Sequence, residues 1–591
     1  MCRLFGLLFL LLVGDAWGQA MKTIPQEYEK LISGGTVMAL GNDLLGDRVD
    51  LYSGRLSFLQ TDVDIPGNNA LPVGISRSFS PHQASVRDHV GHFSDWDLEL
   101  PYMTGVFSAS TGWVVPGTGA AANKRCSNYA APPEVSGLNG SMGGIFSAAE
   151  YWQGNTLHLP GIGDGEVVVR NSALPAPAAD WKLAVKGGIA VRCVASLASG
   201  SMGSGEGFEV LAPNGLHYRF DHLLSMPTSS LQKSDSGPLL MSNGMVGPMV
   251  ATLFYLNRVR VWIFPTEVSD AHGNTLHYYW NAGAPAQLDR IQASDGRELV
   301  FTWSGGHITA ISDGSRTWTY AYTQETTGLA LSSVVLPDGS TWKLQLREFN
   351  NMQDVVVAGS TTCDALVLST SSFQGSITHP SGATGTFVLS PRSHGRSWVD
   401  RECRGGEPSN PYGVGSFAYY PREFPTASLT EKRLAGPGLP TGLKWTYDYG
   451  TPNHCWSTAG NNQLASKICT ASSPDTVTVR VTEPEGRVSR YVFGNRFRVN
   501  EGRLQNADVM TASGSVISAT THAYAPAATG PFPQAVGQSL QPRGDGFLQS
   551  RNEPLQTTST VQNGISFMRK VNTYDVWARP TKVAASSGSA E

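Results

Sequence analysis

The chain has few charged residues and no cluster of basic ones. Charged side chains make up 15% of its 591 residues, and the formal net charge is −4. Proteins that bind nucleic acid or an anionic membrane surface present concentrated Lys and Arg. The composition therefore argues against a nucleic-acid partner and against electrostatic membrane binding. Apolar residues still account for 40% of the chain, which is enough to form folded cores.

Motifs for catalysis and cofactor binding are also missing. The sequence has no G-x-S-x-G, no H-E-x-x-H and no dinucleotide fingerprint. Gly200–Gly207 is rich in glycine but lacks the Lys-Ser/Thr pair that contacts phosphate. Gly161–Gly165 (GIGDG) is similar to a calcium turn, yet it occurs once and such sites need stacked repeats. We therefore expect no enzyme activity, no cofactor and no metal.

Two small clusters of histidine and acidic residues are candidate binding or catalytic sites. His217, Asp221 and His222 could bind zinc or act as a base with its orienting partner. Along a strand, however, His217 and Asp221 would share one face while His222 points to the other. Asp62 and Asp64 also share one strand face, which could indicate a calcium or sugar site. A solvated strand face is the favoured interpretation of that pair.

The cysteines lack the C-x₂₋₄-C spacing of zinc sites. Cys2 lies at the very start of the chain, and the other six are Cys126, Cys193, Cys363, Cys403, Cys455 and Cys469. An even set in an exported chain favours disulfides, and six cysteines allow 15 pairings. We favour sequential pairing, because Cys455 and Cys469 flank a short polar loop.

The N-terminus has the features of a secretory signal peptide. Arg3 precedes a short apolar run, Leu4–Val13, and Ala16-Trp17-Gly18 offers small residues near a cleavage point. The run is about half the ~20 residues that a spanning helix needs, and no later segment is long and apolar enough. We expect a secreted, periplasmic or cell-surface protein. A cytosolic chain with an apolar N-terminal strand is the alternative.

Helical periodicity is nearly absent, and the most regular stretch, Thr266–Leu346, has a period of two. An acidic residue introduces a glycine turn four times: Asp270 to Gly273, Asp295-Gly296, Asp313-Gly314 and Asp338-Gly339. After each turn apolar residues alternate, as in Leu276, Tyr278 and Trp280. This pattern predicts β-hairpins. The glycines are 23, 18 and 25 residues apart, which indicates an imperfect repeat.

The same stretch resembles the YD repeats of bacterial RHS proteins. The matching positions are Asp270, Gly273, Asn274, Tyr278, Trp280, Leu288, Ile291, Gly296 and Arg297. A later unit contains Tyr574-Asp575, but Ala578-Arg579-Pro580 replaces the usual Gly-Arg, which we expect to weaken its turn. Residues 41–80 resemble the opening of many secreted RHS-type proteins.

This pattern gives the fold class and a domain plan. We expect an all-β protein in which repeated antiparallel hairpins form an extended or spiralling sheet, with an N-terminal β-sandwich-like region. Ser225–Met249 is expected to be a loop. The predicted units are a signal peptide at 1–18, a β-rich domain at 19–206 with a Gly/Ala/Ser-rich surface excursion at 104–150, YD-like repeats at 207–350, further hairpins with disulfide-clipped loops at 351–523, and a Pro/Gly-rich loop with a terminal YD-like unit at 524–591.

In function, the resemblance implies a shell that encloses or displays another polypeptide, often a C-terminal toxin. We expect a secreted structural or interaction scaffold with an effector polypeptide as partner, although the D-P-x-G-R boundary motif and a following toxin domain are missing. A carbohydrate-binding module for a cell-surface glycan is one alternative, because 14 tryptophans could stack on sugars. Alternating aromatics more often form a packed strand face. A polymer-acting hydrolase is the other alternative, which two carboxylates within about 10 Å in a pocket would favour.

Overall fold

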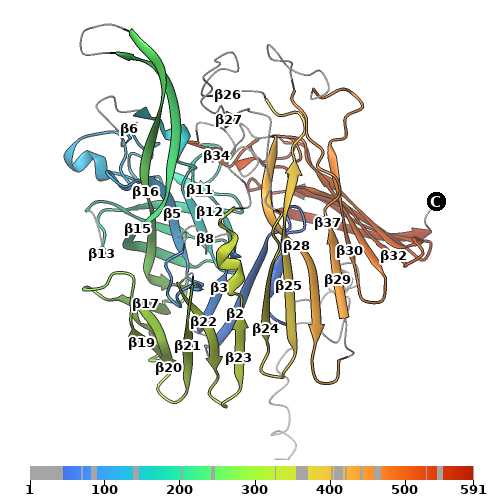
Figure 1. Ribbon diagram of the computed structural model, residues 1–591, viewed down its shortest axis with the longest axis horizontal. Coiled ribbons are helices and arrows are strands. Elements are labelled where there is room, and N and C mark those ends of the chain that lie inside the picture. Colours follow the sequence, from blue (N-terminus) through green and yellow to red (C-terminus); the bar gives the residue numbers. More distant parts are fainter. Residues whose placement is uncertain are drawn as a thin grey trace, which may run out of the picture.

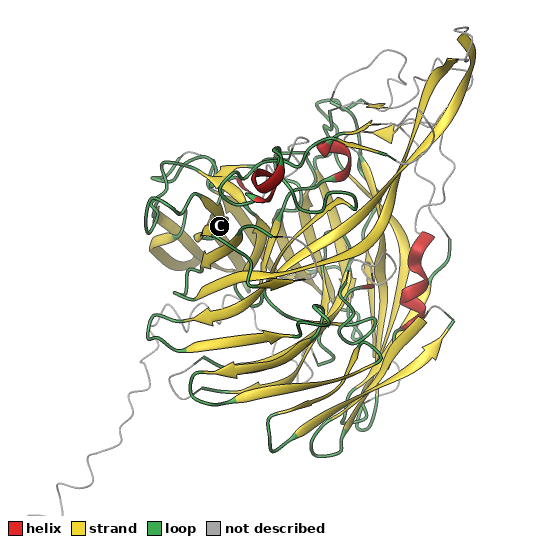
Figure 2. Ribbon diagram, turned by 90° about the vertical axis from the view of Figure 1, so that its left-hand side faces the viewer, coloured by secondary structure: helices red, strands yellow, loops and turns green. Residues whose placement is uncertain are grey.

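The computed structural model describes residues 44–67, 71–81, 89–137, 145–200, 204–240, 246–326, 328–354, 370–400, 403–404, 417–418, 422–439, 443–457, 468–527, 529–541 and 550–589. Nearly all of their regular structure is antiparallel strand (Figure 2). The predicted all-β fold is confirmed, and the large sheet is open. The predicted signal peptide, 1–18, lies outside the described residues.

Within the described residues, 29 strands belong to one large sheet. Its first strands are β5 (Tyr102–Ser108), β8 (Thr156–Leu159), β9 (Gly163–Glu166), β10 (Val168–Arg170), β11 (Leu183–Val185), β12 (Ile189–Val194), β13 (Ser199–Gly200) and β14 (Gly207–Leu211). A hairpin series follows: β15 (His217–Leu240), β16 (Val246–Ser269), β17 (Thr275–Trp280), β18 (Leu288–Ala293), β19 (Glu298–Ser304), β20 (His307–Ser312), β21 (Thr317–Glu325), β22 (Gly328–Val335), β23 (Thr341–Gln345), β24 (Phe373–Thr378) and β25 (Thr384–Gly395).

The series continues as β28 (Glu423–Ala435), β29 (Leu443–Asp448), β30 (Thr476–Thr482), β31 (Val488–Gly494), β32 (Leu504–Met510), β33 (Val516–Tyr524), β34 (Gly537–Gln538), β35 (Leu555–Gln562), β36 (Ile565–Tyr574) and β37 (Pro580–Ser589). Smaller elements are β6 (Val135–Ser136), β7 (Ile145–Phe146), β26 (Cys403–Arg404), β27 (Phe417–Ala418) and the short helices η1 (Gly119–Asn123), α3 (Ala148–Tyr151) and η2 (Arg347–Asp354).

The repeat glycines form the hairpin turns because they adopt a left-handed backbone. Gly273, Gly296, Gly314 and Gly339 have φ values of 85°, 90°, 90° and 82°. Nothing lies within 4 Å of the position that a Cβ would take at any of them. Backbone conformation, and not lack of space, therefore makes glycine the suitable residue here.

A short strand from late in the chain pairs with an early strand of the large sheet. β34 pairs with β10, with Val169 opposite Gln538. Beside this pairing, the Asn171 side chain donates to the Ala535 carbonyl at 3.2 Å. Because β10 connects through β11, β12 and β14 to β15, the chain returns to the region where the hairpin series begins.

β15 and β16 extend well beyond their neighbours as a two-stranded ribbon, which we call the ribbon arm (Gln232–Leu240 and Val246–Phe254). It projects from the body in both views (Figures 1 and 2). Cross-strand register continues out to Leu240 opposite Val246. The predicted loop at Ser225–Met249 is therefore wrong. Proline and polar residues indicated a loop, but proline is tolerated in edge strands.

A separate four-stranded sheet, the N-terminal sheet, comprises β1 (Asp47–Val49), β2 (Leu56–Ile65), β3 (Val73–Phe79) and β4 (Asp97–Leu98). Figure 1 shows its β2 and β3 inside the curve of the large sheet. Phe58 contacts Phe387 edge-on at 5.0 Å, and Phe93 lies 4.6 Å from Tyr320. The two sheets thus pack face to face around one continuous core.

Buried polar contacts also hold the N-terminal sheet in place. Lys432 forms an ion pair with Asp47 at 2.6 Å, and both side chains are less than a tenth exposed. Arg297 donates to the carbonyls of Ile65 and Leu71, each at 2.7 Å. These partners are 226 to 385 residues apart in sequence. The chain therefore covers the inner face of its own large sheet.

Asp62 belongs to this buried contact, so its predicted solvated position is wrong. Its carboxylate pairs with Arg77 at 2.9 Å, and both side chains are at most 1% exposed. Tyr320 donates a further hydrogen bond to it at 3.0 Å. Asp62 continues the inward series of Leu56, Phe58 and Gln60, and a β-bulge between Thr61 and Val63 shifts the alternation so that Asp64 is exposed. Strand alternation alone could not indicate that the two aspartates are separated.

The predicted domain boundaries stay predictions, although sheet membership changes between Leu98 and Tyr102. The surface excursion predicted at 104–150 begins with part of β5, which pairs with both β8 and β16. That stretch is therefore strand within the large sheet. Most residues of β5 are buried, including Thr104, Gly105 and Ser108, so the strand is covered on both faces and shows no alternation that the sequence could reveal.

Candidate functional site

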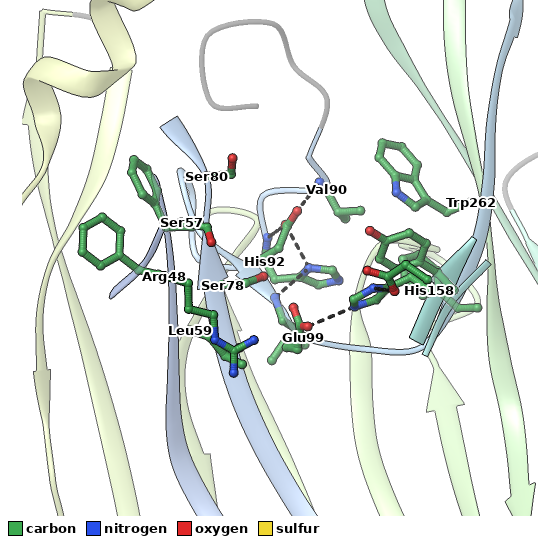
Figure 3. Close-up of a pocket in the computed structure, with 17 residues that line it drawn as sticks. Arg48, Ser57, Leu59, Ser78, Ser80, Val90, His92, Glu99, His158 and Trp262 are labelled. Carbon is green, nitrogen blue, oxygen red and sulfur yellow. Dashed lines mark hydrogen bonds and ion pairs between the residues drawn. The ribbon is translucent and has the colours of Figure 1, made fainter. Parts of the chain in front are cut away.

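A cavity of about 310 Å³ lies where the N-terminal sheet meets β5, β8, β9 and β16 (Figure 3). One side is aromatic, with Phe79, Tyr102, Trp262 and Phe264. The polar side is formed by Arg48, His92, Asp97, Glu99, His158 and Asp164. A neighbouring groove of about 730 Å³ shares Arg48, Leu59, Glu99, His158 and Asp164 with the cavity. The two spaces therefore meet at these residues.

His158 occupies the junction because strand register places it there. It is opposite Tyr102 in the β5–β8 pair and opposite Asp164 in the β8–β9 hairpin. Its Nδ1–H donates to Asp164 at 2.6 Å, its Nε2–H donates to Glu99 at 3.0 Å, and its ring stacks on Tyr102 at 4.7 Å. Burial would lower the pKa of His158, but the two carboxylates outweigh it and raise the pKa to about 9. The imidazole is therefore cationic at neutral pH.

His92 faces the cavity from the turn that precedes β4 (Figure 3). The Asp97 carboxylate accepts the N–H groups of Val90 and Gly91 at 3.0 and 2.6 Å and lies 3.2 Å from His92 Nδ1. Burial would raise the pKa of Asp97, but the hydrogen bond from His92, the charges of His92 and His89 and the Gly91 N–H outweigh it, so the pKa lies below its usual value. The Leu98 N–H also lies 3.4 Å from His92 Nδ1, so both neighbours hold the ring through this nitrogen. The other ring nitrogen, His92 Nε2, is buried and has no hydrogen-bond partner.

The His217, Asp221 and His222 cluster does not form a site. His217 contacts Glu209 at 3.3 Å, Asp221 accepts from Arg219 at 2.6 Å, and His222 lies between Ser199 and the Pro285 carbonyl, at 2.7 Å from each. Asp221 and His222 are both buried and contact different partners, so the predicted opposite directions of the two side chains stay a prediction. Among the described residues, no group of three or more His, Cys, Asp or Glu is arranged to hold a metal.

Most repeat-turn residues lie at exposed hairpin tips. The carboxylate of Asp270 accepts the N–H groups of His272 and Asn274, and the equivalent aspartates Asp295, Asp313 and Asp338 accept N–H groups within their own turns. Asp338-Gly339 and Asp313-Gly314 contact only their own hairpins through these bonds. The Asp295-Gly296 turn differs, since Arg297 reaches from it to the N-terminal sheet.

The terminal YD-like unit forms its turn despite lacking glycine. Tyr574 is buried, and Asp575 accepts the N–H groups of Trp577 and Arg579 at 2.9 and 2.8 Å. Ala578 takes the left-handed position with φ of 61°. A Cβ at such a φ is strained, so the expected weakness lies in backbone conformation and not in lost hydrogen bonds.

Two disulfides are described, Cys126–Cys193 and Cys455–Cys469. Both belong to the sequential pairing. Cys363 lies outside the described residues, and only the backbone of Cys403, in β26, is described. The first disulfide ties the segment after β5 to β12.

The aromatic strand residues pack inward. Trp318 and Tyr320 are 4% and 3% exposed, and their equivalents in neighbouring repeats belong to or contact the same core. This favours the packed-face interpretation of the repeat aromatics over sugar stacking.

Sequence reasoning missed the cavity residues His92, Asp97, Glu99 and His158. Of the cavity residues, Asp164 alone belongs to a predicted motif, the GIGDG turn. Glu99 and His158 are 59 positions apart in sequence, and the pairing of β5 with β8 brings the two stretches together. The one available signal was the density of histidine and acidic residues in GHFSDWDLE.

Comparison with known proteins adds no assignment. No family model and no curated protein matches the chain. Among the described residues, no helix is long and apolar enough for a membrane crossing. Similar solved structures include crystal structures of TcdB2-TccC3, TcdB2-TccC3-Cdc42 and TcdB2-TccC3-TEV, with 9%, 9% and 8% identity and TM-scores of 0.23, 0.22 and 0.23. They cover 93%, 91% and 94% of this chain, which spans only 37%, 36% and 36% of theirs. TM-scores of this size assign neither a family nor a function.

Proposed function

We propose that this chain is a secreted scaffold of the RHS/YD-repeat type, without catalytic activity of its own. One observation carries the proposal: the inner face of the repeat strands holds another stretch of polypeptide, the N-terminal sheet with its turns, through aromatic packing and a buried ion pair. A curved sheet of repeated hairpins with such a face is suited to positioning polypeptide. The resemblance at Asp270–Arg297 and the two disulfides support the family and an oxidising location.

Within that role we favour display of a C-terminal effector over its enclosure. The N-terminal sheet and its connecting turns contact the large sheet from β16 through β31, at Phe264, Tyr320, Phe387 and Phe493. Since this segment occupies the inner face at each of these places, we expect an effector to lie outside it.

The test is to fuse a protease-sensitive reporter after Glu591 and to compare its cleavage rate with that of the free reporter. Display predicts similar rates, within about threefold, while the scaffold itself stays intact. A reporter protected many-fold would show enclosure instead. A scaffold digested as fast as the reporter would contradict a stable holding structure, because cleavage follows the population of open states.

A polymer-acting hydrolase is the second candidate, favoured by one observation. Glu99 and Asp164 lie on opposite sides of one imidazole ring in the cavity. Each carboxylate accepts a hydrogen bond from His158, however, and the protonated ring has no free lone pair to act as a base. Hydrolysis of a polysaccharide panel by the wild type, lost in Glu99→Gln, would support the hydrolase over the scaffold.

A further inference from the structure

The unpaired nitrogen of His92 indicates that the cavity has an occupant. The His92 side chain is 1% exposed, and its Nε2 has no partner. A buried polar nitrogen without a hydrogen bond is costly, so a hydrogen-bonding group is expected to reach it. The ring is fixed by Asp97, and Figure 3 shows it directed into the cavity. The occupant must therefore offer a hydrogen-bonding group at this point, and a hydroxyl group can do so in either direction.

Other polar groups around the cavity extend this requirement. Glu99 and Asp164 each use one named oxygen for His158, through Oε1 and Oδ1. Their second oxygens are acceptors near the junction with the groove. The hydroxyls of Ser57 and Ser78 line the cavity from β2 and β3. A ligand with several hydroxyl groups matches this set of acceptors better than one with a single polar end.

The charges around the cavity favour a neutral ligand. Arg48 and the protonated His158 are balanced by Glu99 and Asp164. Asp97 is already satisfied by His92 and by backbone N–H groups. A charged ligand would leave one charge uncompensated in a partly enclosed space. Metal binding is not indicated, because no suitable group of ligands exists among the described residues.

We infer that the cavity around His92 binds one uncharged sugar residue, and that the adjoining groove along β2, β3 and the β8–β9 turn holds the next residues of an oligosaccharide. Tyr102 and Trp262 provide aromatic surface beside the polar groups, a combination common in small-molecule sites. Arg48 lies at the junction of both spaces and so contacts the ligand where it passes from one to the other. This site goes beyond the scaffold role and does not depend on it.

The test uses the intact chain on an array of neutral, acidic and amine-bearing glycans, followed by calorimetric titration with the neutral oligosaccharide that binds. Arg48→Ala and Glu99→Gln should each weaken binding about tenfold, because each removes one polar contact. Arg55→Ala is the matched control: Arg55 is an exposed arginine just before β2 and does not line the cavity. It should leave the affinity within about twofold.

Three results would overturn the inference. The first is that no neutral glycan binds, which leaves water as the occupant. The second is binding restricted to charged glycans. The third is that Arg48→Ala and Glu99→Gln bind as well as Arg55→Ala, which would place a glycan site elsewhere on the protein. Near-ultraviolet circular dichroism of each variant verifies the fold, and exposed Arg48 gives a reliable variant if Glu99→Gln folds poorly.

Discussion

At the scale of single residues, Arg297 joins the two sheets of the protein. Its Nε pairs with Asp295 in its own turn at 2.8 Å, while its Nη atoms donate to two carbonyls of the N-terminal sheet. Arg316, in the next repeat turn, pairs with Asp313 and lies over Trp318 but makes no described contact with the N-terminal sheet. The same turn type thus has a local role in one repeat and a long-range role in another.

We expect Arg297→Ala to lower the free energy of unfolding by about 1.5–3 kcal/mol, because two buried carbonyls lose a charged donor. Arg316→Ala should cost less than about 1 kcal/mol, since its side chain is 49% exposed and its ion pair is on the surface. Urea unfolding of both variants measures the difference. Equal losses would mean that the contact with the N-terminal sheet contributes nothing beyond the turn.

The identity of Arg297 as a repeat residue could be predicted from sequence, but its partners could not. The carbonyls of Ile65 and Leu71 are more than 200 residues away, and any residue type offers a backbone carbonyl. The cavity was missed for the same reason. His92 and His158 show no spacing motif, and only strand register brings their surroundings together.

At the scale of elements, the turn from Asp575 to Arg579 has the hydrogen bonds of a YD unit with a strained residue in it. Ala578 occupies φ of 61°, where an L side chain is disfavoured. The turn is formed because Asp575 accepts two N–H groups and an ion pair from Arg579 at 2.7 Å. Side-chain contacts here compensate for an unfavourable backbone.

Ala578→Gly should therefore raise the free energy of unfolding by about 0.5–1 kcal/mol, because glycine adopts this φ without a Cβ penalty. Ala584→Gly, in the extended strand β37, is the control and should lower stability by a similar amount. Thermal unfolding followed by circular dichroism measures both. A destabilised Ala578→Gly would indicate that the methyl group makes a favourable contact that outweighs the strain.

Element type was well predicted where the pattern was regular, and poorly where register was irregular. The Asp-Gly turns and aromatic strands of Thr266–Leu346 appear as hairpins β17 to β23. The ribbon arm was predicted as a loop, since its strands lack alternation and contain prolines. Asp62 and Asp64 were expected on one strand face, but a β-bulge at Asp62 shifts the alternation, and a bulge leaves no reliable mark in composition.

At the scale of the whole molecule, Glu166 links regions far apart in sequence. It lies at the end of β9, is 3% exposed, and accepts a hydrogen bond from Ser539, 373 residues later, at 2.6 Å. Burial raises the pKa of Glu166 from 4.5 to about 7, against the smaller opposing effect of the Ser539 hydroxyl. The joining of β10 to β34 is therefore sensitive to pH.

The direction in which stability changes with pH follows from proton binding to Glu166. Between pH 4.5 and 7 the unfolded chain loses the Glu166 proton while the folded chain keeps it, so stability falls over this window and then levels off. Glu166→Gln removes the cost of burying an ionised carboxylate. The free energy of unfolding of this variant should exceed that of the wild type by about 1–3 kcal/mol at pH 8 and be nearly equal to it at pH 4.5. Urea unfolding at both pH values tests this, with exposed Glu134→Gln as the control. A Glu166→Gln variant that is less stable at pH 8 would refute the assignment.

The long sequence separation of the N-terminal sheet from its partners has a consequence for synthesis. β2 and β3 leave the ribosome early, yet the residues that cover them follow 226 to 385 positions later. At roughly 5–20 residues per second, their apolar face waits about 10 to 80 s for Arg297, Tyr320 and Lys432 to emerge. The nascent chain therefore exposes apolar strand surface for tens of seconds, an interval in which aggregation competes with folding.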